Sequence, residues 1–171
     1  SSVFCLTTSI DGHWARSGWP LERLFEMRGA MRWLQCTQPF CAEVWPADEV
    51  RLRSQASKAP ACPRCGCPAR PCVRLDEDAQ GFSTKMWEEQ RGRFLNWGAS
   101  WRDLANKDPN VSLVCLELGC GQGSPARAEL EKVLAGDSRW KLIRVNSGNP
   151  EVPEGPQAVS LHLGAFEALR R

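Results

Sequence analysis

The chain has 171 residues, of which 42% are hydrophobic and 25% are charged. This composition suits one globular domain with a small insert, and a chain of this length can bury a core that does not depend on its cysteines. The net charge is only +2, and no run of roughly 18 apolar residues occurs. Nothing in the sequence therefore points to a specific nucleic-acid partner or to a membrane.

In the N-terminal half, hydrophobic patterns predict a short buried strand over 3–8 and a turn at 11–12. Residues 20–28 carry leucine and phenylalanine at helical spacing, which predicts a helix. Residues 31–72 hold close cysteine pairs with proline and glycine between them, which is typical of a small metal-organised insert. Residues 83–105 predict a long helix, and we interpret its stripe of tryptophan and phenylalanine as core packing.

In the C-terminal half, predicted strands and helices alternate. They are a strand at 111–118, a glycine turn at 119–123, a helix at 125–136, strands at 140–145 and 159–163, and a closing helix at 164–171. Ser124 followed by Pro125 is a typical helix start. A strand, a glycine loop, a helix and a second strand make the repeating unit of a parallel α/β sheet, so we expect a Rossmann-like fold.

Two close cysteine pairs predict one structural zinc site with the ligands Cys36, Cys41, Cys62 and Cys65. Zinc prefers four soft ligands in a tetrahedron, and two short chelating loops supply two thiolates each. Because cysteine fills all four positions, no position remains for water, and the metal is expected to organise the fold without doing chemistry. Cys67 and Cys72 are spare thiols that compete as ligands, and free, buried or disulfide-bonded cysteines are the alternative.

The segment 116–123 reads Leu-Glu-Leu-Gly-Cys-Gly-Gln-Gly and resembles the first motif of class I methyltransferases that use S-adenosylmethionine. That family also needs an acidic residue at the end of the next strand, where this chain has Asn146. A glycine turn before a helix N-terminus equally suits a pyrophosphate or a ribose. A tight turn without any ligand is the third reading.

Read together, several motifs resemble those of the sirtuins, in order and in spacing. Residues 7–12 are similar to the sirtuin segment Thr-Gln-Asn-Ile-Asp-Gly, and residues 26–30 fall where sirtuins carry Glu-x-His-Gly-Ser. The cysteines follow at sirtuin spacing, and residues 70–73 resemble the Arg-Pro-x-Val that leaves the sirtuin zinc module. Residues 143–146 resemble the strand whose final Asn meets the NAD ribose, and residues 164–165 fall near the last nucleotide-contacting loop.

This resemblance implies a partial NAD-binding domain of sirtuin type over 1–30 and 73–171, with a zinc module at 31–72. It implies NAD as co-substrate and a protein substrate, either an acylated lysine or an acceptor of ADP-ribose. The cofactor-binding residues that it implies are Thr8, Ser9, Asp11, Gly119, Gly121, Asn146, Ser147 and Ala165. The form of the glycine motif resembles the divergent, macrodomain-associated branch, which is thought to transfer ADP-ribose.

Departures from the sirtuin pattern bear on catalysis. Arg28 replaces the catalytic histidine, and an arginine stays protonated, so it cannot act as a general base. Asp11 is suited to stabilise positive charge at the anomeric carbon of the ribose, although an Asp-Gly pair also favours a turn. Ser9 stands in place of the family's Asn. The nearby alternatives to the replaced base are His13, Trp14 and His162, and a lone histidine is more often a satisfied surface or core residue. The Gly-Ala-Gly-x-Ser loop that grips the pyrophosphate is missing, so we expect a piece of a larger protein that is inactive alone.

We therefore expect a divergent, NAD-dependent transferase of sirtuin type, acting as a protein deacylase or an ADP-ribosyltransferase. The reduced cysteines favour an intracellular compartment, cytoplasmic or nuclear. Two alternatives stay open: a catalytically dead Sir2-like binding module with a structural zinc, and a methyltransferase.

Overall fold

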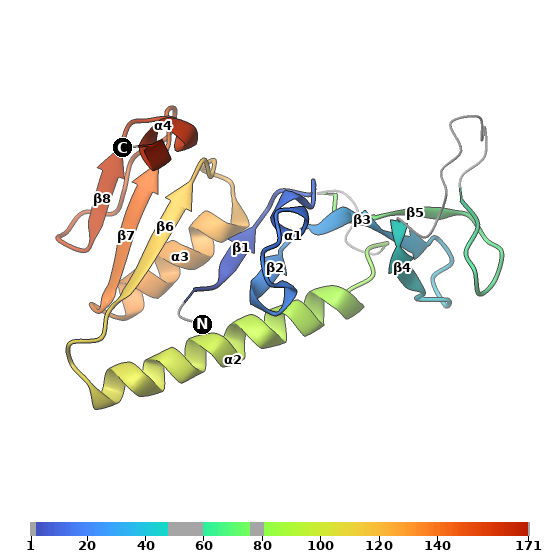
Figure 1. Cartoon of the computed structure of the whole chain (residues 1–171), viewed down its shortest axis with the longest axis horizontal. Helices are drawn as coiled ribbons and strands as arrows, with labels where there is room; N and C mark the ends of the chain where they lie inside the picture. Colours follow the sequence, from blue (N-terminus) through green and yellow to red (C-terminus); the bar gives the residue numbers. More distant parts are fainter. Residues whose placement is uncertain (1–2, 48–59, 76–80, 171) are drawn as a thin grey trace. The chain divides into compact units, whose positions relative to one another are not determined.

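The structure is a computed structural model that describes residues 3–47, 60–75 and 81–170. It divides into two compact units, an N-terminal unit over 1–97 and a C-terminal unit over 98–171 (Figure 1). The predicted boundaries of the zinc module, at 31 and 72, stay a prediction. None of the described helices combines the length and the apolar character needed to cross a bilayer.

The N-terminal unit begins with a short parallel pair of strands. Strand β1 (Cys5–Thr7) confirms the strand predicted over 3–8, and it pairs with β2 (Leu24–Glu26). Helix α1 (His13–Arg16) and a 3-10 turn, η1 (Leu21–Arg23), lie between them in the chain.

The helix predicted over 20–28 is wrong, because this segment forms η1 and then β2. The backbone of β2 pairs with β1, and Leu24, Phe25 and Glu26 are all buried. Pairing with a strand distant in sequence overrides the local helical spacing of the apolar residues.

A second, antiparallel sheet carries the cysteines. Its strand order is β4 (Val44–Pro46), β3 (Gly29–Cys36) and β5 (Ala69–Val73), so β3 is the central strand. The sequence reading assigned no strand to this insert.

Helix α2 (Lys85–Lys107) confirms the long helix predicted over 83–105. The ring of Phe25 lies 5.6 Å from Trp87 and 6.2 Å from Phe94, measured between ring centroids. Phe4 lies 5.3 Å from Phe94 and 5.5 Å from Trp97. These edge-on and tilted contacts confirm the inward packing for Trp87, Phe94 and Trp97. Leu104, which has the same helical spacing, is 42% exposed.

The C-terminal unit is a three-stranded parallel sheet with the order β6 (Leu113–Leu118), β7 (Trp140–Val145) and β8 (Ala158–Leu161). Helix α3 (Pro125–Gly136) lies along one face of this sheet (Figure 1), and α4 (Ala165–Arg170) closes the described chain. These strands and helices confirm the predicted elements to within a few residues, and the mixed α/β fold class with parallel strands is confirmed as well. The last residue of the helix predicted at 164–171 lies outside the described residues.

Candidate functional site: a four-thiol cluster, a carboxylate turn and a glycine turn

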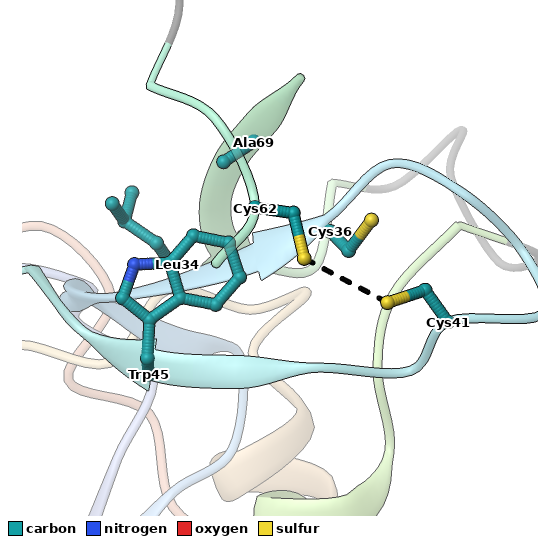
Figure 2. Packing of buried hydrophobic residues seen from close by; sticks show 6 residues of the cluster. All are labelled: Leu34, Cys36, Cys41, Trp45, Cys62 and Ala69. Atoms are coloured by element: carbon teal, nitrogen blue, oxygen red, sulfur yellow. Dashed lines mark hydrogen bonds between the residues drawn. The ribbon is translucent and has the colours of Figure 1, made fainter. Parts of the chain in front are cut away.

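The four cysteines predicted as zinc ligands converge. Their sulfur atoms all lie within 4.8 Å of one another. The Sγ atoms of Cys36 and Cys65 are 3.5 Å apart. Those of Cys41 and Cys62 are 3.7 Å apart, as the dashed line in Figure 2 marks. Around an ion with zinc–sulfur bonds of about 2.3 Å, tetrahedral thiolates are about 3.8 Å apart. The donor set and its spacing therefore fit a closed tetrahedral zinc site.

Local backbone geometry aims the thiols inward. Cys36 is the last residue of β3. In the loop from Cys36 to Cys41, the Cys41 N–H donates to the Gln38 carbonyl at 3.0 Å. In the second loop the Cys62 N–H donates to the Cys67 carbonyl at 2.7 Å, and Gly66 adopts a φ of +74° that favours glycine. Leu34, Trp45 and Ala69 pack around the cluster (Figure 2), so the site is part of the core of this sheet.

The thiols of the cluster differ in acidity. Hydrogen bonds from the Cys67 backbone N–H and from Cys36 lower the pKa of Cys65 to about 6, whereas burial raises the pKa of Cys41 to about 12. Cys72 is buried in β5, where burial raises its pKa to about 11. Among the described residues, neither Cys72 nor Cys67 belongs to the converging group.

Asp11 lies in the turn after β1, and its carboxylate is held from two sides. The Ser9 hydroxyl donates to Oδ2 at 2.6 Å, and the His13 backbone N–H donates to Oδ1 at 2.8 Å. The hydrogen bond from the Ser9 hydroxyl makes the larger contribution to lowering the pKa of Asp11, and the hydrogen bond from the His13 N–H lowers it further. The carboxylate is therefore ionised at neutral pH. It is also open to solvent, with 43% of the side chain exposed.

A buried ion pair lies beneath this turn, and the sequence reading missed it. Gly12 has a φ of +68°, and a Cβ there would lie 3.2 Å from Cδ of Arg32. The Arg32 guanidinium donates to both carboxylate oxygens of Glu26, the shorter contact being 2.7 Å. Glu26 is 2% exposed and also accepts a hydrogen bond from Gln90 of α2. Arg32 thus connects the Asp11 turn to the interior of the unit.

Arg28, which the family resemblance aligns with a catalytic histidine, is the second residue after β2. Its carbonyl accepts the N–H of Arg74 at 2.8 Å. The next residue, Gly29, has a φ of +73°, and a Cβ there would lie within 2.2 Å of the Cys72 carbonyl oxygen. Thr8, Ser9 and Asp11 follow β1. Because β1 and β2 are parallel, both segments leave the same carboxyl edge, which is where ligands bind in open α/β sheets.

In the C-terminal unit, the glycine turn and the loop after β7 are tied together. Gly119 has a φ of +67° and donates its N–H to the Val145 carbonyl at 2.9 Å. The Asn146 amide donates to the Cys120 carbonyl at 2.8 Å, and its oxygen accepts the N–H groups of Gly148 and Asn149. The structure therefore brings Gly119, Gly121, Asn146 and Ser147 to one edge of this sheet. Ala165 is the first residue of α4.

Beneath this edge lies a second buried network that the sequence reading did not anticipate. Arg144 has no exposed surface and binds both carboxylate oxygens of Glu117, at 2.7 and 2.8 Å. Arg144 and Arg127 share the Glu131 carboxylate, at 2.8 and 3.1 Å. Burial opposes ionisation of Glu131, but the two arginines outweigh it and lower its pKa. The sequence held one clue to this pair. Glu117 and Arg144 are the charged residues near the carboxyl ends of two apolar strands, and the register of β6 and β7 places them opposite each other.

Glu117 is also the acidic residue of the segment that resembles a methyltransferase motif. It is 2% exposed and is engaged by Arg144. Its carboxylate thus has a structural partner within the sheet.

The described residues form an α/β protein that has parallel sheets and a four-cysteine cluster. Comparison with known proteins shows which folds and sequences it resembles. No family model matches the sequence. A protein of Fusarium oxysporum f. sp. cubense, named a probable bifunctional ADP-ribose hydrolase/ADP-ribosyltransferase, is 30% identical over 162 residues. That match covers 85% of this chain and 26% of the fungal protein.

Solved sirtuin structures share the fold. One comes from work on the structural basis of sirtuin substrate affinity, and another is Sir2Tm bound to a propionylated peptide. Each has a TM-score of 0.64 and 21% sequence identity over 98% of this chain. The chain spans 62% and 61% of their lengths. The chain therefore shares the fold of the sirtuins.

Proposed function

We propose that this chain is part of an NAD-dependent transferase of sirtuin type, and that it transfers ADP-ribose to an acceptor on a protein. The observation that carries the proposal is an ionised Asp11 carboxylate at the carboxyl edge of β1 and β2 in a Sir2-like fold. Cleavage of the bond between nicotinamide and ribose develops positive charge at the anomeric carbon, and a fixed carboxylate stabilises that charge.

Thr8 and Ser9, beside Asp11, are the proposed contacts at the nicotinamide end. The family resemblance assigns further nucleotide contacts in the C-terminal unit to Gly119, Gly121, Asn146, Ser147 and Ala165. Two of these residues are glycines without close neighbours at the Cβ position, so a ligand could approach this side of the turn closely.

Arg28 favours ADP-ribosyl transfer over deacylation. A deacylase needs a base at this position to activate a ribose hydroxyl, and a guanidinium cannot accept that proton. Its fork of donors suits an anionic group on the acceptor instead. The name of the fungal relative includes ADP-ribosyltransferase, which supports this choice.

Zn²⁺ is the proposed metal, held by Cys36, Cys41, Cys62 and Cys65. When bound, it would cross-link the loops that join β3, β4 and β5, and no chemical step passes through it. We also propose the division into a zinc module at 31–72 and an NAD-binding domain over 1–30 and 73–171. A thiolate site of this kind fits a reducing compartment, cytoplasmic or nuclear.

The test is nicotinamide release and ADP-ribose attachment by the full-length protein supplied with NAD and candidate acceptor proteins. We expect release that depends on the acceptor, loss of it in Asp11→Asn, and no removal of acetyl groups from lysine peptides. Binding of S-adenosylmethionine without binding of NAD would overturn the proposal in favour of a methyltransferase.

Arg28 also favours a second candidate, a catalytically dead Sir2-like module that binds partners. This candidate predicts a normal zinc content and no nicotinamide release with any acceptor. The 171-residue chain alone is expected to be inactive in either case, because it contains no Gly-Ala-Gly-x-Ser sequence for the pyrophosphate. Turnover of NAD by this chain alone would contradict that expectation.

A further inference from the structure

His13 lies against the proposed catalytic carboxylate. It opens α1, and its Nδ1 lies 3.4 Å from Oδ2 of Asp11. Its backbone N–H donates to the other carboxylate oxygen at 2.8 Å. The imidazole is 73% exposed, so a substrate can approach it. The chain has only two histidines, and the other one, His162, contacts the Ser147 carbonyl at 2.6 Å.

Two hydrogen bonds fix the carboxylate that faces the imidazole. The Ser9 hydroxyl and the His13 N–H hold Asp11 at both oxygens. A carboxylate at ion-pair distance from Nδ1 stabilises the imidazolium that forms when Nε2 accepts a proton. Among the described residues, the charged groups next to this pair are Arg16, whose guanidinium donates to the Asp11 carbonyl at 3.0 Å, and Arg32, which packs against Gly12.

We infer that His13 is the general base of the proposed transfer, in place of the histidine that Arg28 replaces. The inference rests on the proposed function. An acceptor hydroxyl or amine attacks the anomeric carbon of NAD while the bond from that carbon to the nicotinamide nitrogen breaks. The electron pair of that bond leaves with nicotinamide, which departs as a neutral molecule. The acceptor's proton passes to Nε2 of His13 and from there to water.

The first experiment compares His13→Gln with His162→Gln in the full-length protein. Glutamine keeps a polar side chain of similar reach but accepts no proton at neutral pH. We expect His13→Gln to lower kcat by about a hundredfold or more while KM for NAD changes little. His162→Gln keeps a donor for the Ser147 carbonyl and is expected to retain its kcat. The fall of kcat/KM on the acidic side of the pH profile should also disappear in His13→Gln.

The second experiment uses chemical rescue, which a purely structural role would not show. His13→Ala removes an exposed side chain, so free imidazole can enter the space that it leaves. We expect added imidazole to restore at least a tenth of the wild-type kcat in His13→Ala and to change nothing in His162→Ala. Equal melting temperatures of the variants and the wild type would show that the fold is kept.

Each outcome decides the matter. If the wild type releases nicotinamide and His13→Gln does so at the same rate, the inference is wrong while the proposed function stands. If the wild type binds NAD but never turns it over, His13 is not a base and the dead module is favoured. If the wild type binds no NAD, the proposed function fails, and the inference fails with it.

Discussion

Arg144 is the most deeply buried charged side chain among the described residues. Arg127, Glu117 and Glu131 surround it, so two positive and two negative charges balance within the C-terminal unit. Arg127 and Arg144 also donate to the Glu151 carbonyl, and Arg127 donates to the Asn149 carbonyl at 3.1 Å. The network therefore fastens the loop after β7 to the sheet and to α3.

Arg144→Met is expected to destabilise the C-terminal unit by about 3–5 kcal/mol, because it leaves the Glu117 carboxylate buried without its partner. The double variant Arg144→Met/Glu117→Leu removes both charges and should regain most of that loss. Urea unfolding of the wild type, the single variants and the double variant measures the coupling. A single variant as stable as the wild type would show that the pair contributes nothing.

Asp137 provides a pH-dependent contribution at the turn after α3. Hydrogen bonds from the Arg139 side chain and backbone lower the pKa of Asp137 to about 2. Since this is below its usual value of 3.8, the stabilisation is full above that value and is lost as the pH falls toward 2. Asp137→Asn should cost about 1 kcal/mol at pH 7, with allowance for solvent screening, and progressively less below pH 4.

Denaturant unfolding at pH 7 and at pH 3 tests this, with Asp103→Asn as a control for the same change of charge at an exposed helix position. A penalty for Asp137→Asn that is equal at both pH values would exclude the ion pair as its cause.

At the scale of elements, β3 connects the thiol cluster with the turn that holds Asp11. Its last residue is Cys36, and near its start the Met31 N–H donates to the Ile10 carbonyl at 2.8 Å. A change in the cluster is thus expected to reach the turn that holds Asp11.

Cys62→Ser is expected to lose the zinc and to disorder the sheet of β3, β4 and β5, because binding of a structural zinc is coupled to folding. The segments 9–12 and 28–30 should be displaced with it. Cys67→Ser is the matched control and should keep one zinc ion per chain. Metal content by mass spectrometry, together with the amide NMR signals of 9–12, measures both effects. Loss of zinc in Cys67→Ser but not in Cys62→Ser would reassign the ligand set.

The entry into β3 depends on a glycine. Gly29→Ala would place a Cβ within 2.2 Å of the Cys72 carbonyl oxygen at a φ of +73°, so β3 and β5 must separate or the backbone must change conformation. We expect a loss of at least about 1–2 kcal/mol from the backbone conformation alone. Gly98→Ala, in the interior of α2 with open space around it, should instead stabilise by up to about 1 kcal/mol. Thermal melts of both variants decide the sign.

At the scale of the whole molecule, the sequence predicted the elements that depend on residues close together in the chain. The strand at 113–118, the helix from Pro125 and the strand at 140–145 follow from continuous apolar runs, a proline at a helix start and glycine breaks. The converging thiols also follow from short-range spacing. The segment 24–36 was not predicted, because its strands depend on partners far along the chain. The ion pairs of Arg32 and Arg144 join residues that single-sequence patterns do not connect.

Zinc removal tests whether the two compact units fold separately. Each unit has its own sheets, and the four clustered thiols all belong to the N-terminal one. A chelator is therefore expected to abolish hydrogen-exchange protection in β3, β4 and β5 while the amides of β6, β7 and β8 stay protected. Adding zinc back should restore the lost protection. Simultaneous loss of protection in both units would mean that they unfold as one cooperative body. Helix α2, which runs from 85 to 107 through the boundary between the units, would then be the element that couples them.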